Sequence, residues 1–168
     1  YCIINDYTII DDNVIIGDNV VIGCDGAYFK RKKNKKIFKI LHAGGVHIKS
    51  DVEVMTGSMI QRAHDIGFTT IDTGTKISVN VVIAHSCLIG KNNIISGGVH
   101  IAGRTTIKDN CWIGMTAMIS DNITIGNNAE VKIGSVVVKN VRDNEIVSGN
   151  FAMPHNKNLK NYIREIRI

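Results

Sequence analysis

Residues 71–137 decide the fold, and in groups of six they run IDTGTK ISVNVV IAHSCL IGKNNI ISGGVH IAGRTT IKDNCW IGMTAM ISDNIT IGNNAE VKIGSV V. Isoleucine or valine opens every group from Ile71 to Val137, and a second small or apolar residue often follows four positions later, as at Cys87 and Ala117. A period of six fits neither the 3.6-residue turn of an α-helix nor the two-residue alternation of a long strand. It predicts a short strand and a turn repeated many times, which is the hexapeptide pattern of a parallel β-helix.

The same phase occurs earlier in the chain, at Ile4, Ile10, Ile16 and Ile22 and again at Ile48, Val54 and Ile60. The pattern resembles that of left-handed β-helices, in which three groups form one triangular coil of 18 residues. That resemblance implies about six coils, with the aliphatic residues stacked in a narrow core. The expected fold class is therefore all-β, a left-handed parallel β-helix of hexapeptide repeats.

Two interruptions divide the repeat. Between Ile22 and Ile48 the step is 26 residues, and the extra residues include a basic run from Lys30 to Lys39. Between Ile60 and Ile71 the step is eleven residues, where twelve would keep the phase. We predict a β-helix domain over residues 1–153, with a protruding loop at about 27–42. Residues 154–168 have helical apolar spacing and are predicted to form a short C-terminal helix that caps the open end of the β-helix.

Composition supports a β protein and excludes several classes. The chain of 168 residues has 29 Ile and 16 Val against 3 Leu, and β-branched side chains favour strands over helices. With 44% hydrophobic and 21% charged residues it is not a disordered chain. No apolar run is long enough to span a membrane, and no signal peptide is visible. The four cysteines match no zinc motif, so reduced thiols in a cytoplasm are expected.

His85 is the leading candidate for chemistry, because it interrupts the aliphatic pattern beside a turn. It is the third residue of the group that begins at Ile83, and the residue one coil later is Gly103. A histidine can take a proton from an attacking amine or hydroxyl, and an unhindered glycine N–H can stabilise the resulting oxyanion. The pair therefore fits acyl transfer, although the same spacing also fits a surface histidine beside a turn glycine.

Several segments resemble UDP-3-O-acylglucosamine N-acyltransferase, a hexapeptide-repeat enzyme of lipid A biosynthesis. They are residues 69–103 (TTIDTGTKISVNVVIAHSCLIGKNNIISGGVHIAG), residues 23–26 (GCDG) before an aromatic loop, and residues 148–155 (SGNFAMPH). The resemblance covers about residues 10–157. It implies that His85 is the general base, that the chain forms a homotrimer, and that the active sites lie between subunits.

Three departures from that family shift the expectation. The family has an aspartate seven residues before the histidine, where this sequence has Ser78. The family's N-terminal domain is not seen in this chain, and its longer C-terminal extension is represented by only about a dozen residues. These differences point towards shorter relatives that acylate amino groups of nucleotide-linked sugars from acetyl-CoA. In those relatives too, the glycine one coil after the histidine offers its N–H to the thioester carbonyl, which implies this role for Gly103.

The sequence therefore predicts an enzyme that moves an acyl group from acyl-CoA or acyl-ACP to an amino group of a nucleotide-linked sugar, in cell-surface glycan or lipid A-type biosynthesis. His85, the Gly103 N–H and Ser78 are the predicted catalytic groups. Weaker substrate-binding candidates are Asp25, Arg62, His64 and His100. The predicted partners are the other two subunits, the nucleotide sugar and an acyl carrier protein. No bound cofactor, metal, nucleic acid or membrane span is expected.

Three alternatives stay open. O-acetylation of a sugar hydroxyl would use the same base and oxyanion donor. A hexapeptide-type zinc carbonic anhydrase would need three histidines around the metal, and His64, His85 and His100 match no such motif. A non-enzymatic β-solenoid would favour a flat and regular face, whereas the outward positions here are irregular and charged.

Overall fold

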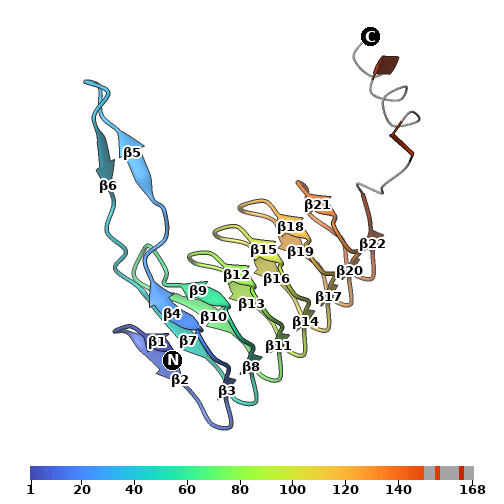
Figure 1. The fold of residues 1–168 in the computed structure, drawn as a ribbon, viewed down its shortest axis with the longest axis horizontal. Helices are drawn as coiled ribbons and strands as arrows, with labels where there is room; N and C mark the ends of the chain where they lie inside the picture. Colours follow the sequence, from blue (N-terminus) through green and yellow to red (C-terminus); the bar gives the residue numbers. More distant parts are fainter. Residues whose placement is uncertain (150–153, 156–162, 165–168) are drawn as a thin grey trace.

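The computed structural model describes residues 1–149, 154–155 and 163–164, so the predicted C-terminal helix falls largely outside the described residues. Three parallel sheets wind around one axis, and a two-stranded hairpin projects from them (Figure 1). The fold is a left-handed parallel β-helix, which confirms the predicted fold class. Among the described residues, no helix has the length and apolar character needed to cross a membrane.

Each sheet is named here after its first strand. The β1 sheet contains β1 (Ile3–Ile4), β4 (Val21–Cys24), β9 (Met59–Gln61), β12 (Val82–Ile83), β15 (His100–Ile101), β18 (Met118–Ile119) and β21 (Val136–Val137). The β2 sheet contains β2 (Thr8–Ile10), β7 (Gly45–Ile48), β10 (Phe68–Ile71), β13 (Leu88–Ile89), β16 (Thr106–Ile107) and β19 (Thr124–Ile125). The β3 sheet contains β3 (Ile15–Ile16), β8 (Glu53–Val54), β11 (Lys76–Ile77), β14 (Ile94–Ile95), β17 (Trp112–Ile113), β20 (Glu130–Val131) and β22 (Ile146–Val147).

The aliphatic residue that opens each group of six fills the core. Ile77 pairs with Ile95, and Ile95 pairs with Ile113, so equivalent positions 18 residues apart stack directly. Their side chains are at most 1% exposed. Because the core is this narrow, β-branched side chains pack along its axis in columns, which explains the excess of isoleucine over leucine.

The turns explain the many asparagines. A residue with positive φ recurs every six positions through the regular coils, and most of these residues are glycine or asparagine, as at Gly74, Asn92 and Asn128. Both residue types tolerate left-handed backbone better than most others. Ser86, Arg104 and Thr116 occupy the same left-handed position, with φ of 58°, 59° and 58°.

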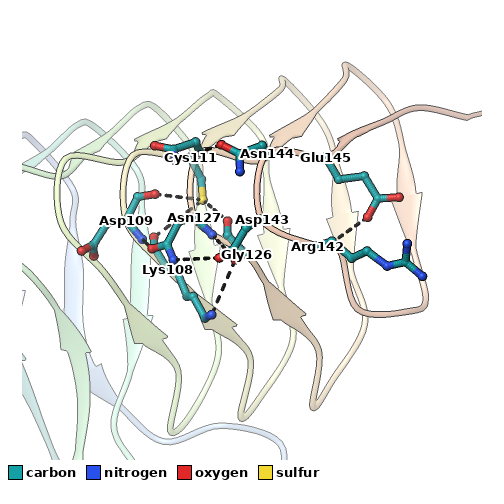
Figure 2. A network of polar contacts seen from close by, with 10 residues as sticks. Lys108, Asp109, Cys111, Gly126, Asn127, Arg142, Asp143, Asn144 and Glu145 are labelled. Atoms are coloured by element: carbon teal, nitrogen blue, oxygen red, sulfur yellow. Dashed lines mark hydrogen bonds and ion pairs between the residues drawn. The ribbon is translucent and has the colours of Figure 1, made fainter.

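Side chains also tie one coil to the next at the corner between the β2 and β3 sheets. The N–H groups of Lys91, Asp109 and Asn127 donate to the side-chain oxygens of Asp109, Asn127 and Asp143, respectively, at 2.8, 3.2 and 2.8 Å. Figure 2 shows part of this ladder, with Lys108 adding an ion pair to Asp143 at 3.5 Å. These contacts satisfy turn N–H groups that no strand partner reaches.

Both interruptions of the repeat lie at one corner, where the chain passes from the β1 sheet to the β2 sheet. We call it the first corner. The hairpin of β5 (Phe29–Arg31) and β6 (Ile37–Lys39) lies between β4 and β7, and a longer turn lies between β9 and β10. Ile60 and Ile71 are the aliphatic residues on either side of that longer turn, so the eleven-residue step is one lengthened turn and not two shortened groups.

The core columns lead to a stability prediction with a matched control. Ile89 is 1% exposed and Leu88, the other residue of β13, is 51% exposed. We expect Ile89→Ala to lower the free energy of unfolding by about 2–5 kcal/mol, because it leaves a cavity in a close-packed column. Leu88→Ala removes a similar volume from the outer face and is expected to cost less than about 1 kcal/mol. Urea titration of both variants measures the difference, and equal losses would contradict this account of the core.

Candidate active site

The first corner gathers the unusual residues of the chain. The hairpin, the longer turn that contains His64, the turn at His85 and the turn at Gly103 leave the β-helix at this corner in successive coils. In Figure 1 the hairpin rises from the same side as the turns that follow β9 and β12. The 18-residue period therefore stacks the insertions on the corner that carries His85.

His85 is held by its own backbone and by the next coil. Its carbonyl accepts a hydrogen bond from the N–H of Arg104 at 2.9 Å, and the N–H of Ser86 donates to the Thr69 hydroxyl at 2.8 Å. The imidazole lies against Gly103: a Cβ at that glycine would lie 2.5 Å from Cε1 and 2.6 Å from Nε2 of His85. The two residues that the spacing predicts to stack are thus in direct contact, and only glycine leaves room for the ring.

The N–H of Gly103 is available to a ligand. Its neighbour Ala102 donates to the Ile119 carbonyl in the next coil, and Arg104 donates back to His85. Within the described coils, the Gly103 N–H makes no backbone hydrogen bond of this kind. A free N–H beside an imidazole is the arrangement that stabilises an oxyanion next to a base.

Three further rings surround His85. The centroid of its ring lies 5.0 Å from that of His64, 5.7 Å from that of His42 and 6.1 Å from that of Tyr28. Tyr28 precedes β5 and His42 follows β6, so both come from the base of the hairpin. The hairpin therefore contributes directly to the wall of the site.

The environment keeps His85 in its neutral form. Burial lowers the pKa of His85 below its ordinary value, and the nearby His64 and His42 act in the same direction. Arg104 also lowers this pKa, whereas the carboxylate of Asp65 opposes the shift. The Nδ1 atom of His85 is buried without a hydrogen-bond partner among the described residues. A neutral imidazole is the form that can accept a proton.

His64 is anchored by hydrogen bonds to the residue after His85. Its Nδ1 lies 2.8 Å from the hydroxyl oxygen of Ser86, and its own N–H donates to the same oxygen at 3.2 Å. The Ser86 hydroxyl donates in turn to Asp65 at 3.4 Å. The side chain of His64 remains 18% exposed, so the ring can be reached from outside.

Asp25 and Arg62 lie together beside the ring cluster. The Arg62 guanidinium donates to the Gly23 carbonyl at 2.6 Å and lies 3.7 Å from the Asp25 carboxylate. Lys39 of β6 donates to Asp25 at 2.5 Å, which is the main reason that the pKa of Asp25 is lowered. These contacts fasten the hairpin to the β-helix.

Ser78 and His100 lie elsewhere in the chain. Ser78 follows β11 at the corner that leads to the β1 sheet, and its carbonyl accepts a hydrogen bond from Ser58. His100 points outward from β15, between Val82 and Met118. Within one chain the structure thus groups His85, Gly103 and His64 and places these two apart. In the part of the chain that the structure describes, no three His, Cys, Asp or Glu side chains are arranged to hold a metal ion.

Tyr28, His42 and Asp65 are the site residues that the sequence pattern misses. All three lie in the insertions, where no periodicity gives them a position. The left-handed positions supply a partial signal, because Ser86 and Arg104 of the site, like Thr116 at another corner, stand where most coils have glycine or asparagine. Unfavourable backbone of this kind clusters at functional sites.

Known sequences similar to this chain are acyltransferases. Residues 104–139 match the bacterial transferase hexapeptide family (six repeats). The UDP-3-O-acylglucosamine N-acyltransferase of Wolinella succinogenes is 33% identical over 81% of this chain and 42% of its own length. The UDP-3-O-acylglucosamine N-acyltransferase 2 of Legionella pneumophila is 48% identical over 67% of this chain and 32% of its own length. The acyl-[acyl-carrier-protein]–UDP-N-acetylglucosamine O-acyltransferase of Aliivibrio salmonicida is 27% identical over 67% of this chain and 42% of its own length.

Solved structures show the same fold. LpxA from Acinetobacter baumannii superposes with a TM-score of 0.67 at 20% identity, over 98% of this chain and 75% of that one. The chain spans less than half the length of the curated relatives named above. The predicted resemblance to hexapeptide-repeat acyltransferases is confirmed by these matches.

Proposed function

We propose that this hexapeptide-repeat protein, which resembles UDP-3-O-acylglucosamine N-acyltransferases, transfers an acyl group from a thioester to an amino group of a nucleotide-linked sugar. The observation that carries the proposal is the contact between His85 and Gly103 at the first corner. A neutral imidazole and a free N–H lie side by side there, as acyl transfer requires.

In the proposed reaction the amine attacks the thioester carbonyl directly. His85 takes a proton from the amine nitrogen as the new C–N bond forms. The carbonyl oxygen becomes negatively charged, and the Gly103 N–H donates a hydrogen bond to it. Collapse of this intermediate breaks the C–S bond, and the electron pair leaves on sulfur. The thiolate then takes up a proton, which replaces the one that His85 removed, so the products are an amide and a thiol. Every step uses groups of the two bound substrates and of the first corner.

The names of the relatives support the choice of substrates. Two of them act on UDP-linked sugars at nitrogen, and one is named for transfer from an acyl carrier protein to a sugar oxygen. We assign an acyl-CoA such as acetyl-CoA, or an acyl carrier protein, as the donor. The two N-acyltransferases share more sequence identity with this chain (33% and 48%) than the O-acyltransferase does (27%), which favours transfer to nitrogen. Transfer to a sugar hydroxyl is the alternative.

Charge at the hairpin fits anionic substrates. Residues 27–50 contain no acidic residue, and the two hairpin strands are exposed along their whole length. The hairpin begins beside Tyr28 and ends beside His42, both of which contact His85. Phosphates of a nucleotide sugar or of a phosphopantetheine group would meet the basic side chains between Lys30 and Lys39, close to the proposed base.

We further propose a homotrimer in the bacterial cytoplasm, with active sites between subunits. Large apolar side chains are exposed on the outer faces of the sheets, and patches of this kind mark interfaces. They include Ile94, Trp112, Met118 and Val136, which are 46–53% exposed. All four cysteines are free, as is usual in a reducing compartment. His100 belongs to one of these outer faces and Ser78 to the corner beside them, where a neighbouring subunit would bring them near a site.

A substrate screen tests the function. The protein is incubated with acetyl-CoA, longer acyl-CoAs or an acyl carrier protein thioester, together with UDP- and dTDP-linked amino sugars. Mass spectrometry is expected to show an amino sugar that has gained one acyl group, with release of an equal amount of thiol. The matching sugars with a hydroxyl in place of the amine are the controls. Acylation of the hydroxyl sugars alone would favour the alternative, and no product from any pair would contradict the proposal.

A further inference from the structure

We propose that His64 is a second catalytic residue, which gives a proton to the departing thiolate while His85 takes one from the amine. This role rests on the proposed acyl transfer. The two relevant features are the hydrogen bonds that fix His64 and the position of its ring beside that of His85. His64 comes from a turn that is longer than the regular turns of the β-helix.

The hydrogen-bond network favours one tautomer of His64. A hydroxyl has one hydrogen to donate, and that of Ser86 is directed to Asp65. With that hydrogen on Asp65, the Ser86 oxygen is an acceptor for the Nδ1–H of His64, which lies 2.8 Å away. With Nδ1 held as a donor, Nε2 is the nitrogen that can gain or lose a proton during the reaction.

The positions of the two rings suit an acid and a base in the same step. Their centroids are 5.0 Å apart and the ring planes meet at 64°. In the tetrahedral intermediate, the amine nitrogen and the thiol sulfur are bonded to the same carbon. A base and an acid that each reach one of these atoms by a hydrogen bond must therefore be close neighbours. His85 contacts Gly103, the proposed oxyanion donor, which belongs to the coil that follows. His64 belongs to the coil that precedes His85.

The environments of the two rings differ in the way the two roles require. His85 lies against Gly103 with its Nδ1 buried and unpartnered, which favours the neutral form. His64 is linked through Ser86 to the carboxylate of Asp65, which lies 3.7 Å from its Nδ1. A carboxylate at this distance stabilises a positive charge on the imidazole, which the proposed acid role requires.

The proton balance closes over one turnover. The amine proton passes to His85 as the C–N bond forms. The electron pair of the C–S bond leaves on sulfur, and sulfur takes the proton from Nε2 of His64. His85 then releases its proton to water and His64 regains one from water. The net change is amine plus thioester to amide plus thiol, with no other reactant.

Donors with different thiol leaving groups test this role. An alkyl thioester such as acetyl-CoA needs its thiolate protonated, whereas an aryl thioester with the same acyl group releases a much weaker base. We expect His64→Gln to lower single-turnover rates by about 100-fold with the alkyl donor, a typical contribution of a general acid. With the aryl donor the same variant is expected to stay within about threefold of the unmodified protein, since no acid is needed.

Two variants serve as controls. His85→Gln is expected to slow both donors alike, because the base acts on the amine. His47→Gln is the matched histidine control: His47 also has a carboxylate partner, Asp11 at 3.0 Å, but is not part of the ring cluster. It is expected to leave both rates unchanged. Circular dichroism and thermal unfolding establish that each variant is folded.

Each result decides a separate question. Equal losses with both donors, in a folded His64→Gln protein, would show that His64 only supports the structure. Full activity of that variant with acetyl-CoA would overturn the assignment outright. If the unmodified protein transfers no acyl group to any amine, the proposed function itself fails, and this is seen before any variant is compared.

Discussion

Replacement of His85 by alanine is expected to lower kcat/KM for acyl transfer by at least about 100-fold. The reason is that the three atoms nearest to a Cβ at Gly103 all belong to the His85 ring, so this ring is the base that lies beside the oxyanion donor. The β-helix itself should remain intact, because the His85 side chain is half-buried at a corner and contributes nothing to the aliphatic columns. Steady-state rates with the pair of substrates found in the screen measure the effect.

His47→Ala is a suitable control for this substitution. The His47 ring contacts Phe68 and Asp11 on the β2 sheet, away from the ring cluster. A folded His85→Ala protein with unchanged kcat/KM would refute the role of His85 as base. Loss of activity in both variants would point to a general effect of histidine removal on stability, which thermal unfolding detects.

The regular part of the fold was predictable because one physical constraint repeats. A triangular core admits one β-branched side chain per side, so Ile77, Ile95 and Ile113 recur at intervals that the sequence displays openly. The same interval places Gly103 on His85, and the structure has the two in contact. Wherever no residue is inserted, the place of a residue in its coil follows from the six-residue period alone.

The remaining site residues were not predictable because insertions break the count. Ile22 pairs with Ile60, and the residues between them include the hairpin. No period indicates that both ends of that hairpin return to the His85 corner. The contacts of Tyr28 and His42 with His85 arise from packing of the hairpin base, which depends on three-dimensional arrangement alone.

The aspartate that the resemblance leads one to expect seven residues before His85 also shows what sequence spacing could not predict. The resemblance places Ser78 at that position, but in this chain Ser78 and His85 lie at different corners, at opposite ends of β12. The carboxylate that acts on His85 within the chain is Asp65, which comes from the lengthened turn. A negative charge near the base is thus supplied by Asp65, which lies in an inserted segment outside the hexapeptide repeat.

Gly103→Ala is expected to reduce kcat by about 100-fold while changing stability little, since a misplacement of about 1 Å is enough for such a loss. The added Cβ would lie 2.5–3.0 Å from three atoms of the His85 ring, so the ring must move. It cannot move far without displacing His64 or His42, whose rings lie within 5.7 Å. The φ of Gly103 is not in the left-handed region, so alanine adds no backbone strain there.

Gly97→Ala separates the effect on the ring from the general effect of adding a methyl group. Its Cβ would meet the Val79 side chain at 3.3 Å, which a small rotation relieves, and its φ is also not in the left-handed region. We expect this control to keep its activity. NMR signals of the His85 ring should shift in Gly103→Ala and not in Gly97→Ala. A Gly103→Ala protein with normal turnover would show that close contact between base and oxyanion donor is dispensable, because the methyl group and the ring cannot occupy the same space.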